Sequence, residues 1–185
     1  SQDAGTEADL RSVFPVGAVA DPDKPRNRPA AGARPSRRRV ARLAAVQALY
    51  QIDLNGDPVE SVIRQFIQHR LGQEIEGLRL EADAGFFVEL VRGVAARREQ
   101  LDAMVASAMA AGRDPQRLEV VLRAILRAGA FELVGRGDVP PRVVIAEYVD
   151  ITVDFFSQKE AALTNAILDR IARTVRAEEL GYGGV

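Results

Sequence analysis

Residues 36–57 read SRRRVARLAAVQALYQIDLNGD, and this stretch predicts a helix with both ends marked in the sequence. Ser36 is a residue type that caps helix N-termini with its side-chain oxygen. Apolar residues then recur at helical spacing until about Leu54, where the turn at 55–57 ends the helix. Three arginines, residues 37–39, open this helix. Cations there oppose the helix dipole, and an incoming phosphate would reverse the sign of that effect.

The chain after residue 57 also reads at helical period, without alternating strands or hairpin signals. A loop is expected around Gly72 and Gly77, and Gly93 is a candidate break in the longest amphipathic stretch. Prolines 58, 115 and 141 stand where helices could begin. Helices are expected over about residues 58–70, 83–111, 115–135, 141–155 and 158–175. Six or seven helices without a sheet predict an all-α bundle.

Composition divides the chain into three parts. Five of the nine prolines fall within the first 35 residues, which predicts a disordered arm over residues 1–35. Residues 36–177 are expected to form one helical domain, and the glycine-rich residues 178–185 a flexible tail. The chain has no cysteine, which excludes disulfides and thiolate metal sites. With no apolar stretch of about 18 residues, a cytoplasmic protein that does not enter membranes is expected.

Charge is distributed very unevenly behind a formal net charge of −1. Residues 26–42 contain seven arginines and no acid, whereas the rest of the chain carries 18 basic and 26 acidic residues. A basic block of this kind is typical of phosphate binding, although a solvated tail is the alternative.

Catalytic chemistry has little support in the sequence. His69 is the only histidine and is expected near the end of a short helix, where a solvated role is typical. The glycines form no phosphate-binding loop, and the carboxylates fall at helix ends and on polar faces. We therefore expect no enzyme activity, no cofactor and no metal site.

Candidate phosphate- and base-contacting residues concentrate in the helix that starts at residue 37. Arg38 and Arg42 are four residues apart and Arg39 lies between them, so they are expected to form one cationic edge, with Arg37 adjacent. Two further residues of this helix leave alternatives open: Gln47 either contacts a base edge or satisfies a buried contact, and Tyr50 is either a core residue with a wet hydroxyl or a stacking platform for a base.

Four stretches resemble the NusB family of bacterial transcription factors in order and spacing. They are RRVARLAAVQALY at 38–50, ILRAGAFEL at 125–133, DVP at 138–140 followed by VIAE at 144–147, and NAILD at 165–169. The resemblance covers about residues 37–175 and leaves out the arm and the tail.

The resemblance implies a non-catalytic, all-helical fold of two packed three-helix subdomains. NusB-like proteins bind single-stranded boxA RNA in nascent ribosomal RNA transcripts together with NusE, a ribosomal protein. With other Nus factors they help RNA polymerase read through terminators. Carried over by position, the family's RNA contacts fall on Arg38, Arg39, Arg42 and Tyr50. The acidic body of the chain is a candidate docking surface for the basic NusE.

Departures from the family pattern and other interpretations remain. Leu163 stands where the family often has a phenylalanine, so Lys159 is the candidate RNA contact in that region, through phosphate. Ala146 replaces a family asparagine. The alternatives are a helical protein-interaction module without RNA binding and a NusB-like fragment of a ribosomal RNA cytosine methyltransferase. A homodimer that hides the arginine edge also stays open.

Overall fold

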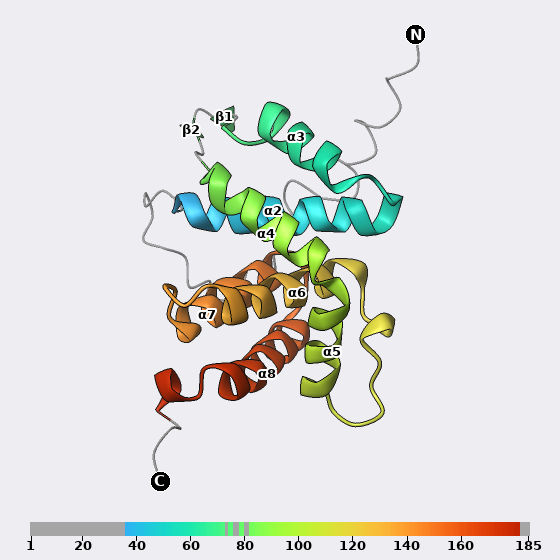
Figure 1. Cartoon of the computed structure of the whole chain (residues 1–185), viewed down its shortest axis with the longest axis vertical. Helices are drawn as coiled ribbons and strands as arrows, with labels where there is room; N and C mark the ends of the chain where they lie inside the picture. The colour runs from blue at the N-terminus through green and yellow to red at the C-terminus, as the bar shows by residue number, and fades with distance from the viewer. Residues whose placement is uncertain (1–35, 73, 76–77, 80–81, 182–185) are drawn as a thin grey trace. The chain divides into compact units, whose positions relative to one another are not determined.

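The computed structural model describes residues 36–72, 74–75, 78–79 and 82–181, so the expected arm lies outside the described residues. Seven α-helices run through this part of the chain (Figure 1). They are α2 (Arg37–Asn55), α3 (Val59–His69), α4 (Ala84–Ala96), α5 (Arg98–Ala108), α6 (Val120–Gly135), α7 (Pro141–Phe155) and α8 (Gln158–Val175). The prediction of an all-α fold is confirmed.

Most helix ends lie where the sequence predicted them. The Ser36 hydroxyl accepts a hydrogen bond from the Arg39 amide at 3.1 Å, and Gly56 ends α2 with a φ of 70°. Pro141 is the first residue of α7. At the start of α8, Ser157 and Glu160 form a capping box in which each side chain meets the other residue's backbone. These caps satisfy backbone groups that a helix end would otherwise leave unpaired.

The break in the stretch 83–111 differs from the prediction. It falls at Arg97, between α4 and α5, and Gly93 lies inside α4. Gly93 is required for a different reason, because a β-carbon there would overlap the ring of Phe131 on α6. The glycine therefore permits a close approach of two helices. Pro115 also opens only a short 3-10 turn (Pro115–Arg117), and α6 begins at Val120.

Two further segments differ from expectation. The region expected to be a loop contains a two-residue antiparallel pairing of β1 (Glu74–Ile75) with β2 (Leu78–Arg79). The helical unit also extends past the expected boundary at residue 177, because Glu178–Leu180 form a 3-10 turn and Leu180 is buried. Neither segment changes the fold class.

Helix α6 is the central element of the packing. It contacts α2 and α4 on one side and α5, α7 and α8 on the other, while α2, α3 and α4 also pack against one another (Figure 1). Eleven of its residues are buried, from Leu122 to Leu133, so nearly every side of the helix is covered. The two expected groups of helices are recognisable, with a fourth helix, α5, in the second group.

Two of the residues buried in α6 are charged. Arg127 is 3% exposed, and it donates to Asp102 of α5 at 2.6 and 2.9 Å and to Asp53 of α2 at 2.5 Å. Burial acts to lower the pKa of Arg127, but the two aspartates outweigh it and the pKa is raised. This cluster joins α2 and α5 to α6. The other charged residue, Glu132, lies nearer the C-terminal end of α6.

Candidate nucleic-acid interface

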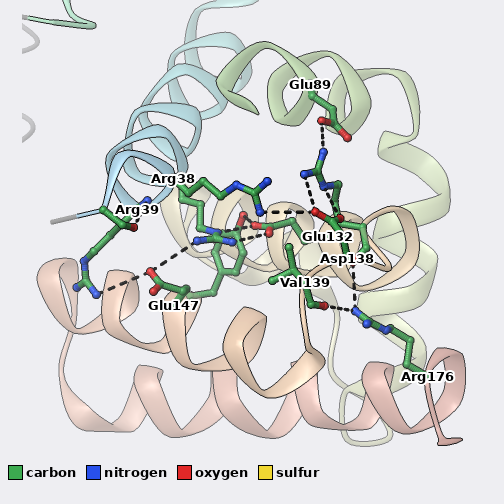
Figure 2. Close-up of polar contacts among 12 residues, drawn as sticks. Arg38, Arg39, Glu89, Glu132, Asp138, Val139, Glu147 and Arg176 are labelled. Atoms are coloured by element: carbon green, nitrogen blue, oxygen red, sulfur yellow. Dashed lines mark hydrogen bonds and ion pairs between the residues drawn. The ribbon is translucent and has the colours of Figure 1, made fainter. Parts of the chain in front are cut away.

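The N-terminal end of α2 presents the arginines that the sequence singled out. Arg37 is exposed, Arg38 and Arg39 are partly exposed, and the first turn contains no acidic residue. The side chains of Arg38 and Arg39 point apart, the first toward the loop between α6 and α7 and the second toward α7 (Figure 2). Arg38 and Arg39 therefore do not form the single cationic edge that was predicted, because their guanidinium groups face different parts of the fold (Figure 2).

The position of Arg42 differs from the prediction that it forms an exposed edge with Arg38 and Arg39. Its side chain is buried, with 3% of the residue exposed, and it donates two hydrogen bonds of 2.9 Å to the two carboxylate oxygens of Glu132. Glu132 is fully buried and also accepts a hydrogen bond from the hydroxyl of Tyr148 on α7. Arg42 is thus a core residue that joins α2 to α6 and α7, and it presents no guanidinium to solvent.

The protonation states of this buried cluster follow from its geometry. Burial acts to lower the pKa of Arg42, but the hydrogen bonds and charge of Glu132 outweigh it, so the pKa is raised. Burial, and then the negative charge of Glu132, raise the pKa of Tyr148 well above the ordinary tyrosine value. The tyrosine therefore stays neutral, and its hydroxyl donates a hydrogen bond to the Glu132 carboxylate.

Arg38 and Arg39 both meet carboxylates from distant parts of the chain. Nη1 of Arg38 lies 3.6 Å from Asp138, in the loop between α6 and α7. Nη1 of Arg39 lies 3.1 Å from Asp150 and 3.8 Å from Glu147, both on α7. Figure 2 shows the Glu147 carboxylate beside the Arg39 side chain, and the same Glu147 oxygen lies 3.9 Å from Nη1 of Arg42.

Three guanidinium groups lie close to the aromatic ring of Phe86, on α4. The central carbons of Arg38, Arg42 and Arg136 lie 5.2, 5.1 and 5.2 Å from the centre of its ring. Contacts of this length are cation–π interactions. Arg136 is fixed further by Glu89, at 2.6 Å. The ring thus helps to fix the direction of the Arg38 side chain.

A third buried arginine, Arg176, holds the loop between α6 and α7 in place. Arg176, just after α8, donates a hydrogen bond of 2.6 Å to the carbonyl oxygen of Val139 (Figure 2). It also donates to the carbonyl oxygen of Gly137 at 3.3 Å and pairs with Glu179. These contacts fix the loop that carries Asp138. Sequence reasoning missed Phe86, Asp138 and Arg176, because their roles depend on partners far away in the chain.

The remaining candidates lie at different depths. Gln47 and Tyr50 are partly buried along α2, and Lys159 is exposed in the first turn of α8, where its amide donates to the Ser157 hydroxyl. Leu163 packs against the core. Of the predicted RNA-contacting residues, Arg42 alone is buried.

Neither a metal centre nor a membrane span is found in the described residues. Within them, no three His, Asp or Glu side chains gather where they could hold a metal ion. Of the helices α2 to α8, none is long and apolar enough to cross a membrane.

Comparison with known proteins decides the family. The profile of the NusB family matches residues 39–173. The chain belongs to the NusB family. The transcription antitermination protein NusB of Bradyrhizobium diazoefficiens is 46% identical over 149 residues, which are 80% of this chain and 90% of the relative. The protein of the same name from Rhizobium etli strain CIAT 652 is 49% identical over 144 residues, 77% of this chain and 90% of the relative.

Solved structures agree on the NusB fold. NusB of T. maritima superposes with a TM-score of 0.65 at 24% identity, over 80% of this chain and 99% of that one. A NusB chain crystallised with NusE and double-stranded RNA superposes with a TM-score of 0.63 at 22% identity, over 75% and 97% of the two chains. At these identities the similarity establishes the fold.

Proposed function

We propose that this NusB-family chain is a transcription antitermination factor. It binds single-stranded boxA-type RNA of nascent ribosomal RNA transcripts together with NusE, and it supports read-through by RNA polymerase in a complex with other Nus factors. The observation that carries this proposal is the 46–49% identity to proteins named for antitermination, over about nine tenths of their length. The function is binding rather than catalysis, and its place is the cytoplasm.

The proposed RNA contacts start at the N-terminal end of α2. Arg37, Arg38 and Arg39 supply positive charge at the N-terminal end of α2, where the helix dipole also favours an anion such as phosphate. Lys159 adds a phosphate contact from α8, and Tyr50 and Gln47 offer base contacts along α2. Arg42 has a supporting role in this proposal, because its guanidinium is bound to Glu132.

The partner protein is proposed on the same grounds. One structural neighbour contains NusB with NusE and RNA. A basic ribosomal protein also fits a body that is acidic outside the arginine block. Neither of the two relatives compared above is named a methyltransferase, which favours the antitermination factor over an enzyme fragment.

Fluorescence anisotropy with labelled boxA RNA, with and without NusE, tests the proposal. The double variant Arg38→Ala/Arg39→Ala should bind at least about tenfold more weakly, since it loses two charge-assisted contacts. Its log–log salt slope should become shallower by about 1.4, the value for two phosphates of a single strand. Arg92→Ala removes an exposed arginine that pairs with Glu60, and it is the matched control. Equal RNA affinity of the double variant and the control would refute the residue assignment, and no binding by the wild type would refute the function.

A further inference from the structure

Two of the three arginines that reach solvent at the start of α2, Arg38 and Arg39, already have anionic partners. The side chain of Arg38 is 43% exposed and that of Asp138 is 55% exposed. The side chains of Arg39 and Asp150 are 31% and 50% exposed, and a hydrogen bond of 3.1 Å joins them. These aspartates come from the α6–α7 loop and from α7, about 100 residues further along the chain. The fold therefore places a carboxylate where a phosphate would bind.

Stability alone does not account for these pairs. Exposed ion pairs contribute little to folding, typically less than about 1 kcal/mol. The ion pairs that join α2 to α6 within the core are instead the buried ones, Arg42 with Glu132 and Arg127 with Asp53. Asp138 is ionised and available to compete: burial acts to raise its pKa, but the charges of Arg136 and Arg38 outweigh this and the pKa is lowered.

We infer that Asp138 and Asp150 compete with RNA phosphates for Arg38 and Arg39, and so limit the affinity of the chain for any single strand. This inference rests on the proposed function. A phosphate that approaches either arginine must displace a carboxylate, and the cost is the same for every nucleotide sequence because phosphates carry no sequence information. The two aspartates thus lower backbone-driven binding and leave the choice of sequence to contacts with bases.

The variants Asp138→Asn and Asp150→Asn test the inference, with Asp169→Asn as the matched control. Asp169 forms an exposed ion pair with Arg173 within α8, so the control removes the same kind of contact away from α2. Binding is measured by anisotropy with boxA RNA and with a scrambled strand, between about 50 and 200 mM salt. Each test variant should bind both strands about two- to fivefold more tightly than the wild type, which is the range of an exposed ion pair. The salt slope should steepen by up to about 0.7 for each arginine released.

Several outcomes decide the question. Wild-type affinity in both variants would overturn the inference, and so would tighter binding of the same size in Asp169→Asn. Weaker binding of boxA alone would also overturn it, since the carboxylates would then accept hydrogen bonds from bases. Asp138 also pairs with Arg136 at 3.0 Å, so the fold of that variant is checked by urea unfolding, and Asp150→Asn provides an independent test. If the wild type binds RNA but the variants gain nothing, the proposed function stands and this inference fails.

Discussion

Replacing Glu132 by glutamine leaves the buried guanidinium of Arg42 without its carboxylate partner. The substitution keeps the size and shape of the side chain and removes its charge. Arg42 is 3% exposed, so water cannot replace the lost interaction. Removing one member of a buried pair typically costs about 3–5 kcal/mol. Glu147, 3.9 Å from Arg42, supplies partial compensation, so we expect a loss near the lower end, about 3 kcal/mol.

Urea unfolding followed by far-UV circular dichroism measures this loss. With a denaturant slope of about 2 kcal/mol per molar, the midpoint should fall by about 1.5 M. The triple variant Arg42→Met/Glu132→Leu/Tyr148→Phe replaces the whole cluster by apolar groups, and it should recover most of the lost stability. Asp169→Asn, which breaks an exposed pair, should lose no more than about 0.5 kcal/mol. A Glu132→Gln protein within about 0.5 kcal/mol of the wild type would refute the assignment of Arg42 as a core ion pair.

Three further substitutions test other parts of the fold by the same unfolding assay. Gly93→Ala should cost about 1–2 kcal/mol, because overlap with the Phe131 ring exceeds the gain in helix propensity, and adding Phe131→Leu should relieve it. Because the pKa of Tyr148 is raised in the folded protein, its protonated hydroxyl contributes to the free energy of unfolding. This contribution is fully present below about pH 10 and falls by about 1.4 kcal/mol per pH unit as the pH rises further. Tyr148→Phe should remove this part of the slope, and an unchanged slope would contradict the reasoning. Ser157→Ala should cost about 1 kcal/mol by removing the cap of α8, whereas no loss would show that Glu160 alone suffices.

The helices could be predicted from the sequence because their ends are encoded locally. Ser36, Gly56, Pro141 and Ser157 each act on backbone groups within a few residues, so no knowledge of distant partners is needed. The break at Arg97 could not be predicted in the same way. Gly93 carried the local signal for a break, but its physical role is contact with α6, which the sequence does not display.

The burial of each arginine also could not be predicted from the neighbouring residues in the sequence. Helical spacing places Arg38, Arg39 and Arg42 near one another, but it does not say which of them faces the core. A signal was present nonetheless: Arg42 follows Val40 and Ala41 and precedes a run of apolar residues, and Glu132 lies within another apolar run. Two opposite charges on otherwise apolar helix faces are typical of a buried pair, since isolated buried charges are strongly unfavourable.

Two buried ion pairs join α2 to α6, and the helix that supplies the cation differs between them. Helix α2 supplies the cation at Arg42 and the anion at Asp53, whereas α6 supplies the anion at Glu132 and the cation at Arg127. If α2 were laid across α6 in the opposite direction, arginine would face arginine and carboxylate would face carboxylate. The arrangement of charges therefore favours one direction of α2 across α6. The small side chains of alanine-rich helices distinguish the two directions poorly by shape alone. Exchanging cation and anion on both helices would preserve the matching, and exchanging them on one helix would destroy it.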